Sequence, residues 1–250
     1  MRISIAKLII NSFDYLQQKK IFVFLKKKLK KNAILFDVGA HHGETINNFI
    51  KYFDFSNIHS FEASNKNFKT LKNKIKKHLD NRIFLNNFGL SDLNKSLKIK
   101  QFQETSSTTL SKINHNSKYF KRKIKVLGLK ENKKIYENCD VELNQLDNYC
   151  EKNKINKIDL LKIDTEGHEY FVIKGSINTL KKIKYIYFEH HYDDMLIKGY
   201  KYSDIHDLLK KHNFVKIFKS KMFFRKTFEY IYENSKLDWR NNLFVVLLFK

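Results

Sequence analysis

The sequence of 250 residues contains no proline, only 7 glycines and only 2 cysteines. No Gly/Ser-rich stretch divides it, so we expect a single large α/β domain at residues 33–250 after a short N-terminal segment. Cys139 and Cys150 provide neither a disulfide framework nor the spacing of a metal site. This usage fits a reducing, intracellular compartment, and we expect a cytoplasmic protein.

Long apolar runs are also missing. The longest, residues 243–249, is far shorter than the roughly 20 residues that a membrane-spanning helix needs, and it has the length of a buried strand. Arg2, Lys7 and Asp14 interrupt any early apolar run, so no signal peptide is apparent. The chain therefore has the pattern of a globular protein with no predicted membrane span.

Acidic residues are few: 26 Asp and Glu stand against 49 Lys and Arg, which gives a net charge of +23. Such a charge suits binding to nucleic acid, anionic lipid or an acidic glycan. The chain is also crowded with Lys, Asn, Ile and Phe, which A/T-rich codons encode, so genomic base composition is the favoured explanation of the lysine excess. The sequence leaves both explanations open.

The N-terminal segment has a helical pattern at residues 3–31. One face carries apolar residues at helical spacing, namely Ile5, Leu8, Ile9, Phe13 and Leu16. A second piece, residues 21–29, is followed by further lysines. We expect residues 1–32 to form a basic helical cap on the domain with the lysines in water. The alternative is peripheral contact of residues 1–31 with a membrane surface.

From residue 33 onward, strands and helices alternate. We expect strands at 33–39, 57–62, 82–89, 141–146, 157–164, 183–191, 214–218 and 242–249. Helices are expected at 44–53, 65–79, 147–154, 170–182 and from an N-cap at Ser203 to about residue 212. Residues 96–135 are polar and irregular, which predicts a short hairpin or an active-site insertion. Repeated βα units with apolar strands indicate a parallel sheet covered on both faces.

The first strand runs into the sequence FDVGAHHGET. Gly39 and Gly43 stand at a strand-to-helix turn, as in dinucleotide-binding folds, where glycine lets the backbone approach a ligand. Glu62 ends the next strand, 25 positions after Asp37, close to the ~20-residue offset at which an acid binds ribose hydroxyls. Asp37 would repel a pyrophosphate but not a sulfonium. The pattern favours S-adenosylmethionine over a capped turn with a solvated acid.

Six segments in this order resemble the FkbM family of S-adenosylmethionine-dependent methyltransferases: FDVGAHHGET, FEASNKNFKTLKNKI, NNFGLSD, VELNQLDNY, IDLLKIDTEGHEYFVIKGS and IYFEHH. The similarity covers roughly residues 33–220. It implies the α/β, Rossmann-like class I methyltransferase fold, a seven-stranded, mostly parallel sheet with helices on both faces and an antiparallel last strand. It also implies methyl transfer to a hydroxyl, typically on a sugar, glycan or secondary metabolite.

The resemblance also implies a set of cofactor-binding positions. These are Asp37, Gly39, Ala40, Gly43, Glu62, Ala63, Ser91 and Asp92. Ser106 and Ser107, in the polar insertion, are candidates for contact with the acceptor. His41 and His42 depart from the family, which usually carries Asn and an apolar residue there, and this departure puts a side-chain contact from position 41 in doubt.

The acid-rich stretch LLKIDTEGHE at residues 160–169 holds the catalytic candidates. Asp164 ends an apolar strand with no obvious basic neighbour, so we expect it in the active-site cleft. Glu166 and Glu169 lie near a helix start, where the dipole favours acids without any catalytic role. An alcohol needs a base to become a good nucleophile. Among Asp164, Glu189 and His191 we prefer His191, because a histidine pKa near ~6.5 suits that role.

Three functions stay open at this point. The first is O-methyl transfer to a sugar, a glycan or a related metabolite. The second is an RNA or DNA methyltransferase, suggested by the charge and the many aromatic residues. A chain without proline cannot carry an Asn-Pro-Pro-Tyr tetrad, and no specific nucleic acid is predicted. The third is a non-catalytic membrane-surface or binding protein. Carboxylates and a histidine also suit Mg²⁺, but no metal site is predicted. The acceptor and the oligomeric state are not assigned.

Overall fold

The computed structural model describes residues 2–78, 80–102, 109–127 and 136–237. A seven-stranded sheet of order β11-β12-β9-β8-β1-β2-β3 organises the chain. From one edge to the other the strands are Phe214–Lys221, Thr227–Asn234, Ile183–His191, Ile158–Ile163, Ala33–Val38, Phe55–Phe61 and Ile83–Asn86. β12 runs antiparallel to both of its neighbours, and the other adjacent pairs are parallel. The expected fold class is confirmed.

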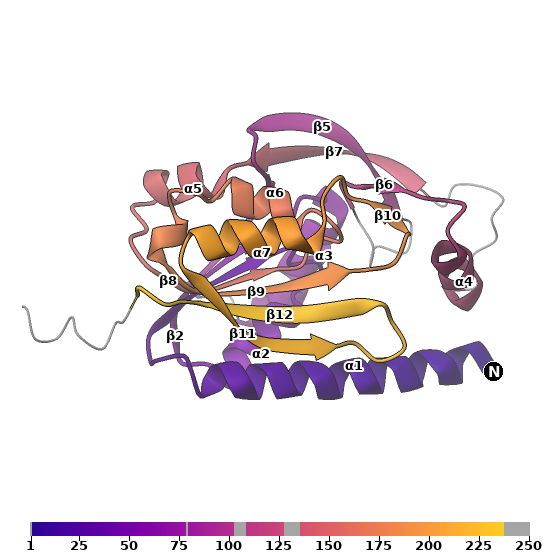
Figure 1. The fold of residues 1–250 in the computed structure, drawn as a ribbon, viewed down its shortest axis with the longest axis horizontal. Helices are drawn as coiled ribbons and strands as arrows, with labels where there is room; N and C mark the ends of the chain where they lie inside the picture. The colour runs from indigo at the N-terminus through magenta and orange to yellow at the C-terminus, as the bar shows by residue number, and fades with distance from the viewer. Residues whose placement is uncertain (1, 79, 103–108, 128–135, 238–250) are drawn as a thin grey trace, which may run out of the picture.

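Both faces of the sheet are covered, which explains why its central strands are apolar throughout. All six residues of β8 are buried. One face packs against α5 (Leu146–Lys152), α6 (Glu169–Lys174) and α7 (Tyr202–Lys211). The opposite face packs against α1 (Arg2–Lys26), α2 (Glu44–Tyr52) and α3 (Asn65–Ile75). Figure 1 shows α1 lying along the side of the sheet opposite α7.

The helix α1 is one continuous helix that ends at Lys26, instead of two pieces that reach residue 31. Ile21, Phe22 and Leu25 are buried in the core on that face of the sheet. Lys19 and Lys20, on the outer side, are exposed. Among the described residues, no helix is long and apolar enough to cross a membrane.

Smaller elements surround the main sheet. β5 (Lys95–Phe102) pairs antiparallel with β7 (Tyr136–Asn144), which also pairs with β4 (Gly89–Leu90). β6 (Lys112–Ile113) pairs with β10 (Leu196–Ile197), and α4 (Lys118–Leu127) follows β6. Part of the segment expected to be irregular therefore forms a strand pair. Ser106 and Ser107 lie outside the described residues.

The structure corrects the sequence-based predictions mainly at a missed strand, at the end of a helix and at an N-cap. The antiparallel strand is β12, which the sequence analysis missed, whereas the strand expected at 242–249 lies outside the described residues. The helix expected at 170–182 stops at Lys174, and a 3-10 helix, η3, occupies Leu180–Lys182. Ser203 is not the N-cap of α7: Lys201 is, and its backbone N–H donates to Asp204 Oδ2 at 2.7 Å.

Candidate active site

The turn between β1 and α2 is pressed against the end of β8. Gly39 has φ +85°, and a Cβ at this position would lie 1.9 Å from the backbone oxygen of Asp164. The Asp164 N–H donates to the Val38 oxygen at 2.9 Å, which ties the two strand ends together. A side chain at position 39 would therefore clash with backbone as well as strain the turn, so glycine is required.

Glu62, at the end of β2, is held by the backbone of two loops. Its Oε2 accepts the N–H of His41 at 2.9 Å, and its Oε1 accepts the N–H of Ser64 at 2.9 Å. Ser64 in turn caps α3 by accepting the Asn67 N–H. Burial raises the Glu62 pKa, against the opposing effect of these donors. The side-chain amide of Asn67 also donates to Oε1, at 3.5 Å, so Oε2 is the oxygen that keeps capacity for a ligand hydroxyl.

A cavity of about 250 Å³ opens where these strand ends meet. Five of the residues implied by the sequence line it, namely Gly39, Ala40, Glu62, Ala63 and Asp164. Other lining residues include Gln18 from α1, the apolar Phe61 and Leu90, and the polar Asn67 and Thr165. The sequence analysis gave α1 no role here, and nothing in its helical pattern indicates which residue reaches the cavity.

Asp37 lies outside this lining and is completely buried. The Nζ of Lys162 lies 3.6 Å from Asp37 Oδ1 and 3.2 Å from Asp164 Oδ2. Burial raises the pKa of Asp37 to about 6, and the Lys162 charge opposes that rise. Burial alone would lower the Lys162 pKa, but the charges of Asp164 and Asp37 hold it above its usual value. The expectation that Asp164 has no basic neighbour was wrong, because Lys162 precedes it by two residues on the same strand.

The remaining cofactor candidates do not reach the cavity. Ser91 Oγ hydrogen-bonds to His168 Nε2 at 2.9 Å, and Asp92 pairs with Lys174 at 2.9 Å, so both contact the segment that carries α6. Gly43 begins α2 with φ +91°, and a Cβ there would lie 2.8 Å from Ile75. The geometry gives these three residues contacts within the fold, and their direct contact with a ligand stays a prediction.

His191, at the end of β9, is surrounded by carboxylates. Its Nε2 lies 3.1 Å from Glu189 Oε1 and 3.5 Å from Glu166 Oε2, and its Nδ1 lies 3.5 Å from Asp193 Oδ2. Burial would lower the pKa of His191, but these acids raise it well above the usual value. An imidazole that is protonated at neutral pH has no lone pair to accept a proton. The geometry therefore argues against our preference for His191 as the base.

Glu229 extends this acidic region into β12, where it lies opposite Glu189 in the sheet. It accepts hydrogen bonds from Gln17 Nε2 at 2.7 Å and from the Tyr187 hydroxyl at 2.5 Å. Burial raises its pKa to about 7, and the charge of Glu189 adds to that rise. The aromatic and β-branched residues of TFEYIYEN at 227–234 could have revealed the strand, but nothing in this pattern indicates the inward position of Glu229.

Two residues of the cavity lining have left-handed backbone conformations, His41 with φ 47° and Glu166 with φ 50°. Non-glycine residues in this region cost about 1–3 kcal/mol each and cluster at functional sites. The backbone N–H of His41 contacts Glu62. The change of side chain at position 41 therefore leaves the backbone contact of the loop in place.

Asp164, Glu189 and His191 do not converge as a metal site. Within the described part of the chain, the group of donors close enough to hold an ion is His41, His42 and Glu44, whose ligand atoms lie within 4.8 Å of one another. One oxygen of Glu44 already accepts the His42 N–H at 3.1 Å and lies 3.4 Å from His41 Nδ1. The structure gives Mg²⁺ at the β8 and β9 ends no support.

The strand order and the cavity at the strand carboxyl ends define a Rossmann-like methyltransferase fold. The model of the methyltransferase FkbM domain matches residues 37–216. The chain therefore belongs to the FkbM methyltransferase family. A comparison with curated proteins gives no match.

Solved structures agree on the fold at low sequence identity. Methyltransferase FkbM from Methylobacillus flagellatus KT matches with a TM-score of 0.53 and 14% identity, over 82% of this chain and 44% of that chain. This chain thus spans less than half of that protein. An uncharacterized protein from Listeria monocytogenes serotype 4b has a TM-score of 0.51 and 11% identity, over 89% and 71% of the two chains. A rRNA-methylase, so titled, from Clostridium thermocellum has a TM-score of 0.50 and 8% identity, over 86% and 94%.

Proposed function

We propose that the protein is an S-adenosylmethionine-dependent O-methyltransferase that acts on a hydroxyl of a sugar, a glycan or a related metabolite. The observation that carries this proposal is that Glu62 and Asp164 face one cavity from the ends of β2 and β8, on either side of β1. One carboxylate suits ribose hydroxyls, and the other suits a cation.

The residues around the cavity fit the cofactor. Glu62 Oε2 keeps acceptor capacity for a ribose hydroxyl, and Gly39 and Ala40 allow close approach of the ligand to the backbone. Phe61 and Leu90 supply apolar surface for an adenine. When bound, the cofactor supplies a methyl group that is activated by a positively charged sulfur. Asp164, which lines the cavity, would face that positive charge.

Asp164 is the residue to which we assign proton removal. Its side chain is 36% exposed and lines the cavity, unlike those of Asp37 and His191. Lys162 Nζ donates to its Oδ2 at 3.2 Å, and this contact leaves Oδ1 to take the proton. The acceptor hydroxyl would lose its proton to this oxygen as it attacks. Positioning and base catalysis then act together.

A second cavity, of about 430 Å³, adjoins the first and supports a polar acceptor. The two cavities share Ile99, Thr109 and Leu110 as lining residues. The second is also lined by Lys98, Lys112, Ser111 and His115, and none of its lining residues in the described part of the chain is an acid. Hydroxyl donors together with cations favour a hydroxylated acceptor that carries carboxylate or phosphate groups.

The proposal is tested by titration calorimetry with S-adenosylmethionine, followed by transfer of a labelled methyl group. We expect binding by the pure protein, and label in acidic or phosphorylated sugars that is lost in Asp164→Asn. Failure to bind the cofactor would refute the proposal. Incorporation of label into RNA, with salt-sensitive retention of RNA, would replace the sugar acceptor by a nucleic acid.

A further inference from the structure

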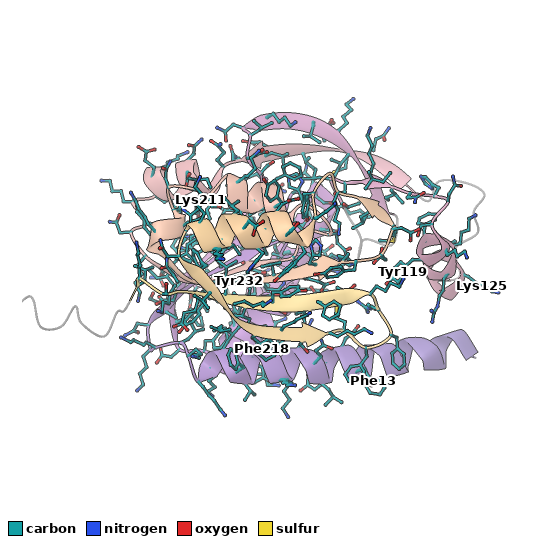
Figure 2. All side chains as sticks on the ribbon, viewed as in Figure 1. Phe13, Tyr119, Lys125, Lys211, Phe218 and Tyr232 are labelled. Carbon is teal, nitrogen blue, oxygen red and sulfur yellow. The ribbon has the colours of Figure 1, made fainter. Side chains whose placement is uncertain are left out.

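An exposed aromatic patch lies between α1 and the turn that joins β11 to β12. We define this patch as Phe13, Leu16, Phe223 and Phe224. The ring of Phe13 lies 4.9 Å from that of Phe223 and 5.5 Å from that of Phe224. Phe223 is 50% exposed, Phe224 63% and Leu16 57%. Figure 2 shows Phe13 on α1 beside this turn, and Phe218 on β11 further along the same seam.

The backbone at the tip of the turn is not one that a phenylalanine favours. Phe224 has φ 60°, in the left-handed region, where a bulky residue is an outlier. Glycine or asparagine would adopt this conformation at lower cost and would expose no ring. The exposed ring at position 224 is therefore not a requirement of the turn, and it calls for an explanation outside the fold.

Positive charge surrounds the patch. Lys221 and Lys226 flank the turn and are exposed, as are Lys19 and Lys20 on α1. Asp14, the acid beside the patch on α1, is ion-paired with Arg225. Exposed rings bordered by lysines are the composition that sits at a lipid interface, with rings among the headgroups and ammonium groups at the phosphates.

We propose that the aromatic patch docks this protein onto the surface of an anionic lipid bilayer, with Phe223 and Phe224 as the inserted anchors. This goes beyond contact by residues 1–31 alone, because the hairpin supplies the rings. It does not depend on the proposed methyl transfer.

The place of the turn in the sheet gives this docking a consequence. β11 runs parallel to β9, since β12 is antiparallel to both. The turn after β11 therefore lies at the same end of the sheet as the carboxyl ends of β1, β2 and β8, where the candidate active site opens. Docking at this end of the strands brings the cavity close to the bilayer and suits an acceptor carried on a lipid.

The test is sedimentation of the full chain with vesicles of phosphatidylcholine alone, or of phosphatidylcholine and phosphatidylglycerol in equal amounts. We expect binding to the anionic vesicles that weakens at high salt. The double substitution Phe223→Ser and Phe224→Ser should weaken this binding about tenfold or more, because ring insertion and charge act together. Phe84→Ser is the matched control, since Phe84 is 42% exposed on β3 at the opposite edge of the sheet.

Three outcomes would overturn the proposal. The full chain could fail to bind anionic vesicles. The double variant could bind as well as the parent, which would assign binding to charge alone. Sedimentation velocity could show a dimer that the double variant converts to a monomer, which would assign the patch to a second copy of the chain. Unchanged thermal unfolding of the double variant shows that a loss of binding is not a loss of fold.

Discussion

Two groups of carboxylates at the carboxyl ends of the parallel strands are held in different ways. Both oxygens of Glu62 accept backbone N–H groups at 2.9 Å. Among the residues that the structure describes, neither oxygen of Asp37 has a hydrogen-bond partner, and the same holds for Oε2 of Glu166. These acids, which end β1 and follow β8, depend instead on the charges of Lys162 and His191.

This difference predicts two separate functions, ligand binding near Glu62 and turnover near Asp164. Backbone donors fix Glu62 in one geometry, which suits a ligand that must be held in one place. Buried acids that rely on nearby charges change protonation when a ligand changes the local charge. We therefore expect substitutions near Glu62 to change binding, and substitutions near Asp164 to change turnover.

The largest expected effect is that of Asp164→Asn. Removing the proposed base should lower kcat by about 10²–10⁴-fold and leave the Kd for S-adenosylmethionine within a few fold. Single-turnover kinetics and calorimetry measure the two quantities separately. Asp140→Asn, at an exposed position on β7, is the control. If Asp164→Asn kept full turnover, Asp164 would not be the base, and the assignment of binding to Glu62 and turnover to Asp164 would be wrong.

Glu62→Gln should weaken cofactor binding by about 10–100-fold, because it replaces a charge-assisted acceptor by an amide. One of its two oxygens becomes an NH₂ group facing a backbone donor, either that of His41 or that of Ser64. Calorimetric titration gives the Kd, and kcat at saturating cofactor should change little. A fall in kcat with an unchanged Kd for the cofactor would assign Glu62 to turnover instead of binding.

A smaller effect concerns stability, and it separates two acids of β12. The pKa of Glu229 is raised to about 7 in the folded state, so the native protein binds this proton more tightly than the unfolded chain does. Stability therefore falls as pH rises from the unfolded pKa, near 4.5, to about 7. Glu229→Gln removes this loss and should stabilise the fold at pH 8 by up to about 3 kcal/mol. A flip of the Gln17 amide would preserve its hydrogen bond.

Glu233 provides the opposite sign on the same strand. Lys184 lies 3.1 Å away and, against the effect of burial, holds the pKa of Glu233 below its usual value. Glu233→Gln should therefore destabilise the protein at neutral pH, and this loss should vanish as pH falls through the lowered pKa. Thermal unfolding from about pH 2 to pH 8 measures both variants. If the stability changes of Glu229→Gln and Glu233→Gln had the same sign and the same dependence on pH, the opposite pKa shifts of the two glutamates would be contradicted.

The fold was largely predictable because its signals are local. The apolar strands at 33–38 and 158–163 and the turn at Gly39 follow from composition and spacing, and the position of Glu62 follows from the turn. β12 was missed because residues 243–249 form a longer apolar run than residues 227–234, where glutamates interrupt the aromatic residues. The aromatic and β-branched residues were the signal for β12, and the length of the apolar run was given more weight.

The candidate site was less predictable because its charges pair across distant segments. The contact of Gln17 with Glu229 joins residues 212 positions apart, and no local pattern indicates it. Glu166 approaches His191 from the loop after β8, which no local pattern indicates, whereas Glu189 and Asp193 lie two residues before and after it; together the three carboxylates reverse the protonation expected for an isolated histidine. Lys162, two residues before Asp164, was likewise visible in the sequence.

The smallest predicted effect tests whether α1 belongs to the site. Gln18 lines the cavity from outside the segment that matches the family, and its Oε1 accepts a hydrogen bond from Asn48 at 3.5 Å. Gln18→Ala should weaken cofactor binding about 3–10-fold, the range for one neutral hydrogen bond and its packing. Lys19→Ala, at the next and exposed position, should change nothing. Equal Kd values for the two variants would show that α1 packs on the sheet without contacting the cofactor. Cofactor binding and turnover would then both depend on residues 37–216.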